Sequence, residues 1–174
     1  MRRANSIEPR WCLVLKVIIR RAAKEDLGKM IDLAAASVDS SIPPSRDVSP
    51  ETVRAARIAD LESSLPQLLP MSHMGLFVAE DENGVFLGHV MGYLGDTESV
   101  TGERQGWIFD MSVVEKYRGM GVGTQLMNHF VDFVRKAGFQ FVGLLVTSAN
   151  DKAVSFYERL GFVEERKRMA KRLS

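Results

Sequence analysis

The spacing of hydrophobic residues changes in the middle of the chain, and this change predicts a strand followed directly by a helix. Between 107 and 114 the residues alternate with a period of two, as in a strand with one buried face. The predicted buried face carries Trp107, Phe109, Met111 and Val113. After Gly123 the apolar positions recur at helical spacing, and Gly138 is a stop signal. The apolar side of that helix carries Leu126, Met127, Phe130, Val131 and Val134.

The same patterns predict the remaining elements. We expect helices at 24–38, 50–69 and 151–160, and strands at 17–21, 76–80, 85–93, 139–147 and 163–173. Asn83-Gly84 separates two of these strands and is typical of a hairpin, so the two should pair antiparallel. The strand at 139–147 is apolar on both faces and follows a helix, so it should run parallel to the strand at 107–114. The polar or turn-rich segments at 39–50 and 95–106 are expected to be loops.

Length and composition fit one soluble globular domain. Of the 174 residues, 45% are hydrophobic and 26% are charged, which is enough apolar material for a core. We divide the chain into a basic, partly ordered extension at 1–16 and one domain at 17–174. Lys16 interrupts the apolar run of the extension, and no small-residue cleavage site follows, so a signal peptide is not favoured. Cys12 is the only cysteine, which excludes an internal disulfide and favours a reducing compartment.

The net charge of +1 is unevenly distributed. Residues 1–21 carry six basic and one acidic side chain, residues 164–174 carry five and two, and the residues between them carry a net −7. A total so close to neutrality argues against a dedicated nucleic-acid binder. The acidic middle would suit a cationic amine as substrate, although an acidic solvated surface gives the same composition.

The loop Arg118-Gly119-Met120-Gly121-Val122-Gly123 joins the central strand to its helix and is the main candidate binding site. Its glycines let the main chain approach a ligand, and the helix start adds unpaired N–H groups at the positive end of the helix dipole. Arg118 adds a positive charge, so we expect the loop to bind an anion such as a diphosphate. A glycine turn that binds nothing is the alternative. The residues and glycine spacing of this loop match neither a P-loop nor a dinucleotide-binding loop.

Two motifs resemble the signatures of the GNAT superfamily of acetyl-coenzyme-A-dependent N-acetyltransferases. The first is Arg118-x-x-Gly121-x-Gly123, and the second is Asn150 opening a helix that ends in Tyr157-x-x-x-Gly161-Phe162. Their order and separation match the family, and they cover about the last 70 residues. The resemblance implies an α+β fold. Its mixed, mostly antiparallel central sheet would have about six or seven strands flanked by helices, with a parallel strand pair joined by the coenzyme-A-binding helix.

The resemblance also implies a cosubstrate, acetyl-CoA, and the residues that hold it; no metal is expected. Main-chain groups at 111–114 would pair with the pantetheine arm, which requires a strand edge that its neighbour leaves open. Asn150 would cap its helix and contact the same arm. The residues expected to bind the cofactor are Met111, Ser112, Val113, Val114, Arg118, Gly119, Met120, Gly121, Val122, Gly123, Thr124, Asn150 and Tyr157.

The implied reaction is direct attack of an amine on the acetyl thioester. An amine of pKa about 10.4 must first lose a proton, and Asp110 or Glu80 is our candidate for starting that relay. A structural hydrogen bond is the alternative role of Asp110. Tyr157 stands where the family places its tyrosine acid, and packing beside Phe156 is the alternative. Three histidines without metal-ligand spacing or a partner pattern are expected to be structural, namely His73, His89 and His129.

We therefore expect a cytoplasmic N-acetyltransferase that moves acetyl from acetyl-CoA to a primary amine of a small molecule or protein within a ternary complex. A non-catalytic acetyl-CoA sensor or partner-binding domain is one alternative, and a nucleic-acid-associated protein that uses its basic ends is another. The expected partner is the amine acceptor, and a homodimer is left open. No membrane partner is expected, and nucleic acid is not favoured.

Overall fold

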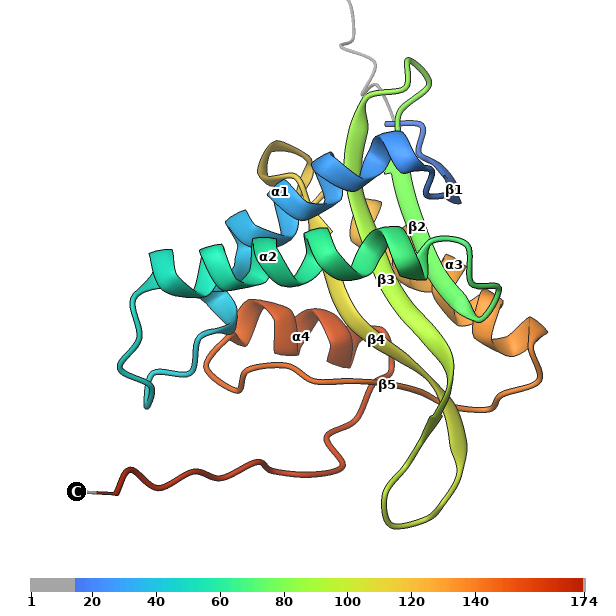
Figure 1. The fold of residues 1–174 in the computed structure, drawn as a ribbon. Helices are drawn as coiled ribbons and strands as arrows, with labels where there is room; N and C mark the ends of the chain where they lie inside the picture. The colour runs from blue at the N-terminus through green and yellow to red at the C-terminus, as the bar shows by residue number, and fades with distance from the viewer. Residues whose placement is uncertain (1–14, 174) are drawn as a thin grey trace, which may run out of the picture.

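The computed structural model describes residues 15–173, which form a five-stranded sheet with helices on both faces (Figure 1). The extension predicted at 1–16 lies outside the described residues except for its last two. The elements are β1 (Ile18–Arg21), α1 (Leu27–Ser37), α2 (Pro50–Leu68), β2 (Met74–Glu80), β3 (Phe86–Thr97), β4 (Arg104–Val113), α3 (Val122–Lys136), β5 (Val142–Leu144) and α4 (Asp151–Arg159).

The strands lie in the order β1-β2-β3-β4-β5. All neighbours pair antiparallel except β4 and β5, which are parallel and are connected through α3. The predicted hairpin between β2 and β3 is present: Gly84 has φ of 76°, and Asp81 Oδ1 accepts hydrogen bonds from the N–H groups of Asn83 and Val85, both at 2.9 Å. The mixed, mostly antiparallel α+β fold is therefore confirmed, but the described residues form five strands instead of the expected six or seven.

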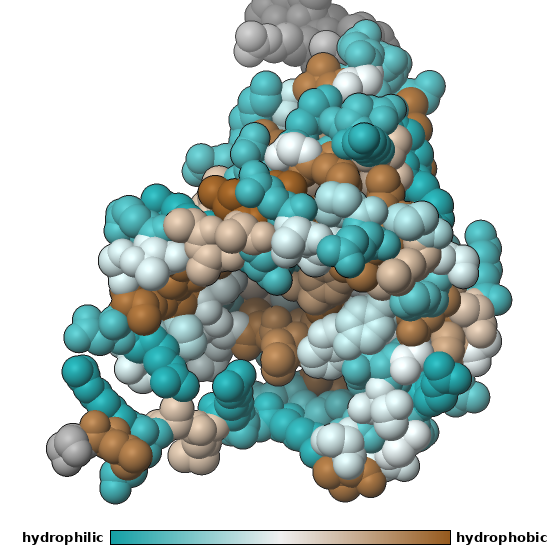
Figure 2. All heavy atoms as spheres, viewed as in Figure 1, coloured by the Kyte–Doolittle hydropathy of each residue, from teal (hydrophilic) through white to brown (hydrophobic). Residues whose placement is uncertain are grey.

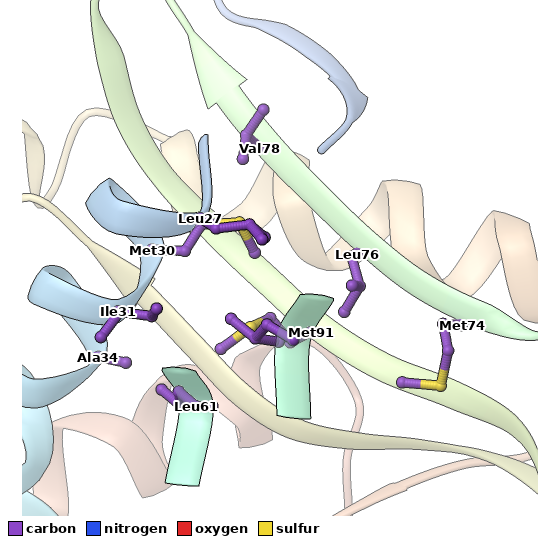
Figure 3. Close-up of a cluster of buried hydrophobic side chains, with 10 residues drawn as sticks. Leu27, Met30, Ile31, Ala34, Leu61, Met74, Leu76, Val78 and Met91 are labelled. Atoms are coloured by element: carbon purple, nitrogen blue, oxygen red, sulfur yellow. The ribbon is translucent and has the colours of Figure 1, made fainter. Parts of the chain in front are cut away.

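Two hydrophobic clusters cover the two faces of the sheet. On one face α1 and α2 pack over β2 and β3, and Figure 3 shows their side chains gathered around Met91. The buried members of this first cluster are Leu27, Met30, Ile31, Ala34, Leu61, Leu65, Met74, Leu76, Val78 and Met91. On the other face α3 supplies most of the second cluster, whose buried members are Phe77, Ala79, Leu87, Val90, Ile108, Val122, Leu126, Met127, Phe130 and Val134.

The predicted apolar stripe of α3 is confirmed, and the sheet is shaped to receive it. Phe130 is fully buried, and glycines in β2 and β3 make room for its ring. A Cβ on Gly92 would lie 2.4 Å from Phe130 Cζ, and one on Gly75 would lie 2.7 Å from Phe130 Cε2. The close approach of α3 therefore depends on the absence of side chains at these two positions.

Three sequence predictions about the strands were wrong. The segment 163–173 forms no strand: it runs away from the sheet (Figure 1), and its residues are exposed. Five of its side chains are basic, and because burying charged groups costs free energy, packing this segment against the short β5 is disfavoured. The strand predicted at 139–147 is shorter, at Val142–Leu144, and pairs with only three residues of β4. The loop predicted at 95–106 is shorter, since β3 continues to Thr97 and β4 starts at Arg104.

Candidate functional site

A gap opens between β4 and β5 beyond Ile108. The two strands pair only at Gly106↔Val142, Trp107↔Gly143 and Ile108↔Leu144. From Phe109 to Val113, β4 keeps β3 on one side and has no strand on the other among residues 15–173. The open strand edge that the sequence predicted is therefore present.

A β-bulge lies at the point where β4 leaves β5. The register of β3 and β4 shifts between Met91 and Gly92, which leaves Phe109 as the extra residue on β4. Phe109 packs against the cluster under α1 and α2, whereas Met111 and Val113 pack against the cluster under α3. The prediction that these three residues share one face was wrong, because the extra residue interrupts the alternation.

The main-chain groups of β4 divide between β3 and the gap. The N–H of Val114 donates to the carbonyl of Leu87 at 2.9 Å, so Val114 points its main chain toward β3. Because this direction alternates along an antiparallel pair, Ser112 also faces β3, and Met111 and Val113 face the gap. Of the four strand residues expected to bind the pantetheine arm, Met111 and Val113 thus turn their main-chain groups toward the gap, and the carbonyl of Val113 there accepts a hydrogen bond from Arg118 Nε.

The glycine loop forms a concave surface at the end of the gap. Gly119 and Gly121 have φ of 77° and 83°, and a Cβ on either one would meet nothing within 4 Å. Helix α3 then begins, and the N–H groups of Val122, Gly123 and Thr124 have no hydrogen-bond partner within residues 15–173. Open space over the loop and three donors at the positive end of a helix dipole suit an anion.

Arg118 lies across the rim between the loop and the gap. Its Nε donates to the carbonyl of Val113 at 3.0 Å, and the side chain is exposed. This bond fixes the guanidinium beside the glycines while no described residue bonds its two Nη groups. Met120, by contrast, is 54% exposed and contributes its main chain to the loop rather than a packed side chain.

Helix α4 brings Tyr157 to the same region. Its neighbour Phe156 lies close to Gly123, where a Cβ would be 3.4 Å from Phe156 Cζ. The ring of Tyr157 packs between Phe156 and Phe162, with centroids 5.3 and 5.7 Å away, and its hydroxyl bonds no described residue. Burial, and then the negative charge of Asp110, raise the pKa of Tyr157 to about 12. The hydroxyl therefore stays protonated at neutral pH.

Asn150 is the N-cap of α4, as predicted. Its Oδ1 accepts a hydrogen bond from the N–H of Ala153 at 3.2 Å, and its carbonyl accepts from the same N–H at 3.0 Å. The side-chain NH2 group has no partner among the described residues. It remains available to a ligand.

Asp110 is held from two sides. Its Oδ1 lies 2.7 Å from His89 Nε2, and its Oδ2 accepts from Arg57 Nη2 at 2.8 Å. Burial alone would raise the pKa of Asp110, but the hydrogen bonds from His89 and Arg57 outweigh it and lower the pKa below its usual value. No partner pattern in the sequence indicated the contact of His89 with Asp110, and Arg57 carried no sequence signal.

Two other carboxylates, Glu80, which is the second candidate for proton transfer, and Glu98, lie away from the gap. Glu80 accepts from Arg20 Nε at 3.1 Å and from Arg20 Nη2 at 2.8 Å, on the far side of the sheet from β5. Glu98 lies at the β3–β4 turn, where the N–H groups of Thr101 and Val100 and the charge of Arg166 lower its pKa to about 2. Neither carboxylate lies near Asp110, so the structure groups only Asp110 with Tyr157.

Two hollows flank this region. Figure 2 shows that the face below α2 is hollowed and that apolar surface forms part of its floor. A separate cavity of about 320 Å³ lies at the other end of the β4–β5 pairing, and its lining residues are Glu98, Thr101, Glu103, Gln105, Phe141, Glu165 and Arg166.

In residues 15–173, no cluster of three or more His, Cys, Asp or Glu residues could hold a metal ion. None of the described helices is long and apolar enough to cross a membrane.

Comparison with known proteins places this geometry in context. The model of the acetyltransferase (GNAT) family matches residues 46–162, more than half of the chain. A mycothiol acetyltransferase of Propionibacterium freudenreichii is 33% identical over 88 residues. That alignment spans 51% of this chain but only 27% of the relative, so the chain matches about a quarter of that protein.

Solved structures share the fold over nearly the whole chain. A Pyrococcus furiosus protein described as an acetyl transferase has a TM-score of 0.74 and 24% identity, covering 91% of this chain and 100% of its own. An aminoglycoside N-acetyltransferase solved in complex with CoA has a TM-score of 0.68 and 19% identity, covering 91% and 95%. At these identities the likeness shows the fold alone.

Proposed function

The chain belongs to the acetyltransferase (GNAT) family, and from that premise we propose that it transfers the acetyl group of acetyl-CoA to a primary amine. One observation carries the proposal: the free edge of β4 from Phe109 to Val113 leads directly into the open glycine loop. A strand edge and an anion-binding loop in one line suit a ligand with an extended amide-bearing arm and a diphosphate. Acetyl-CoA has both, and it supplies an acetyl group activated as a thioester.

The residues around the loop fit the charged end of that cosubstrate. The unpartnered N–H groups of Val122, Gly123 and Thr124 would donate to the diphosphate, and the space above Gly119 and Gly121 would admit it. Arg118 would add a charge-assisted hydrogen bond through its Nη groups. The Asn150 side-chain NH2 and the main-chain groups of Met111 and Val113 would hold the arm along the gap.

Tyr157 would act on the sulfur that leaves. With its pKa raised to about 12, the hydroxyl is a stable donor but a weak acid. Complete proton transfer to a thiolate of pKa about 8.5 would be uphill by about 5 kcal/mol. We therefore assign Tyr157 hydrogen-bond donation to the departing sulfur, and the substrate amine supplies the proton that finally neutralises the products.

Asp110 is a poor candidate for carrying the amine proton away. A carboxylate of ordinary pKa about 3.9 lies about 6.5 units below a lysine-like amine, which corresponds to about 9 kcal/mol, and the lowering in this protein widens that difference. We therefore propose that Asp110 stays ionised as a fixed negative charge near Tyr157. The acceptor therefore reacts through its neutral fraction: for an amine of pKa about 10.4 at pH 7, loss of the proton to bulk solvent costs about 5 kcal/mol.

The acceptor is proposed as a cationic primary amine of a small molecule or a protein. The net negative middle of the sequence favours an ammonium over an anionic acceptor. The test is calorimetric titration of the purified chain with acetyl-CoA, followed by a thiol-release assay with polyamines, aminoglycosides, amino acids and peptide N-termini. Binding followed by turnover with at least one amine is expected. Binding without turnover across the panel would favour a non-catalytic sensor, and no binding would overturn the proposal.

A further inference from the structure

The bulge on β4 and the opening of the gap coincide with a three-residue side-chain contact. Asp110 follows the extra residue Phe109 and is the second residue of β4 beyond the last pairing with β5. The next residue, Met111, turns its main chain toward the gap. Since a trans peptide is planar, the orientation of Asp110 determines the direction of the Met111 N–H.

The carboxylate of Asp110, on β4, contacts side chains of β3 and α2 at this point. Oδ1 meets His89 on β3 at 2.7 Å, and Oδ2 meets Arg57 on α2 at 2.8 Å. The side chains are 15% exposed for Asp110, 22% for Arg57 and 0% for His89. Both oxygens of a nearly buried carboxylate thus have fixed donors, which leaves the side chain one orientation.

His89 is specialised for this contact. Its ring is fully buried, and Nδ1 has no hydrogen-bond partner among the described residues. A buried N–H without an acceptor is costly, so the hydrogen of the imidazole is assigned to Nε2, where it points at Asp110. The ring therefore keeps one polar contact and leaves another polar atom unsatisfied, which a role in filling the core alone does not explain.

We propose that Arg57, Asp110 and His89 form a bridge that positions the N–H of Met111 to donate to the acetyl carbonyl of the bound cosubstrate. This inference rests on the proposed function. The three are positioning residues: they hold the bulge and the peptide after it, while Met111 makes the contact. Removing either arm of the bridge lets that N–H turn, and a misplacement of about 1 Å at a reacting group can cost about 100-fold in rate.

The test compares matched substitutions at His89. His89→Gln keeps an N–H donor near the position of Nε2, whereas His89→Leu removes it at similar volume. Arg57→Met removes the other hydrogen bond to Asp110. Because Arg57 is partly exposed on α2, this variant still tests the bridge if substitution of the buried His89 causes misfolding. His129→Leu is the control, because His129 contacts Phe77 on the opposite face of the sheet.

Two readouts separate positioning from general stability. The first is the carbonyl stretching band of bound acetyl-CoA labelled with ¹³C at the carbonyl, which moves to lower frequency when an N–H donates to it. The second is the division between kcat and acetyl-CoA affinity. For His89→Leu and Arg57→Met we expect loss of the band shift and kcat reduced about 10- to 100-fold, with Kd for acetyl-CoA within about threefold. His89→Gln and His129→Leu should keep the shift, with kcat within about threefold of the wild-type value.

The outcomes distinguish failure of the bridge from failure of the proposed function. A wild-type band shift that survives in both His89→Leu and Arg57→Met would overturn the bridge and leave the proposed function intact. Parallel loss of affinity, unfolding midpoint and kcat would show that the contact only stabilises the fold, and this also would overturn it. Failure of the wild-type protein to bind acetyl-CoA would overturn the proposed function and the bridge with it.

Discussion

Replacement of Gly121 by glutamate is the sharpest perturbation of the anion-binding loop. Gly121 has φ of 83°, and a Cβ there would meet nothing within 4 Å in the ligand-free protein. The folded chain can therefore accommodate the new side chain at the cost of a left-handed conformation, which is about 1 to 2 kcal/mol for a non-glycine residue. The carboxylate would project from the loop into the space that we assign to the diphosphate.

The expected loss of affinity follows from charge. Two unit charges about 4 Å apart repel by about 4 kcal/mol at an effective dielectric constant of about 20. At about 1.4 kcal/mol per decade, this corresponds to about 1,000-fold. Salt screening and the freedom of an exposed side chain reduce it, so we expect the Kd for acetyl-CoA to rise about 100- to 1,000-fold. Gly121→Gln, which adds bulk without charge, should raise Kd by about 10-fold or less.

The assay is titration calorimetry, with Gly138→Glu as the matched control. Gly138 also has positive φ, at 87°, and open space for a Cβ, but it follows the other end of α3, about 25 Å along the helix axis from Gly121. The control therefore carries equal strain and equal charge away from the loop. If Gly121→Glu and Gly138→Glu bound acetyl-CoA equally well, the assignment of the loop as the diphosphate site would be refuted.

Three further predictions concern Tyr157 and the sheet. Tyr157→Phe should lower kcat about 10- to 100-fold while leaving the Kd for acetyl-CoA within about threefold, because the hydroxyl acts on the leaving sulfur; an unchanged kcat would contradict that role. The raised pKa of Tyr157 implies stability that is fully present below pH 10 and is lost as pH rises from 10 toward 12, so urea unfolding should show wild type losing about 2 kcal/mol more than Tyr157→Phe over that interval. Equal losses would contradict the buried environment. Gly92→Ala should destabilise the protein by more than about 2 kcal/mol, since its Cβ would lie 2.3 Å from the carbonyl oxygen of Trp107 and 2.4 Å from Phe130; an unchanged unfolding midpoint would show that α3 packs differently.

The features that local sequence determines were predictable. The apolar stripe of α3, the Asn83-Gly84 hairpin and the N-cap at Asn150 each depend on residues within a few positions of one another. The open edge of β4 was inferred from family resemblance, and the structure supplies its cause in the bulge at Phe109. Trp107, Ile108 and Phe109 are apolar in succession, so the hydrophobic pattern alone does not show which residue is the extra one.

The features that depend on register between distant segments were not predictable. His89 and Asp110 are 21 residues apart, and Arg57 and Asp110 are 53 apart, so their contacts exist only once β3, β4 and α2 are docked. The period-two pattern also could not decide whether 163–173 finds a partner strand. In the described residues the neighbouring strand, β5, has only three residues and offers little edge.

Amide hydrogen exchange along β4, with and without acetyl-CoA, tests the central claim most directly. The N–H groups of Ser112 and Val114 point toward β3 and should exchange slowly in both states, while those of Met111 and Val113 face the gap. We predict that acetyl-CoA slows exchange at Met111 and Val113 and leaves their two neighbours unchanged. Binding of acetyl-CoA with no added protection at Met111 and Val113 would contradict the account.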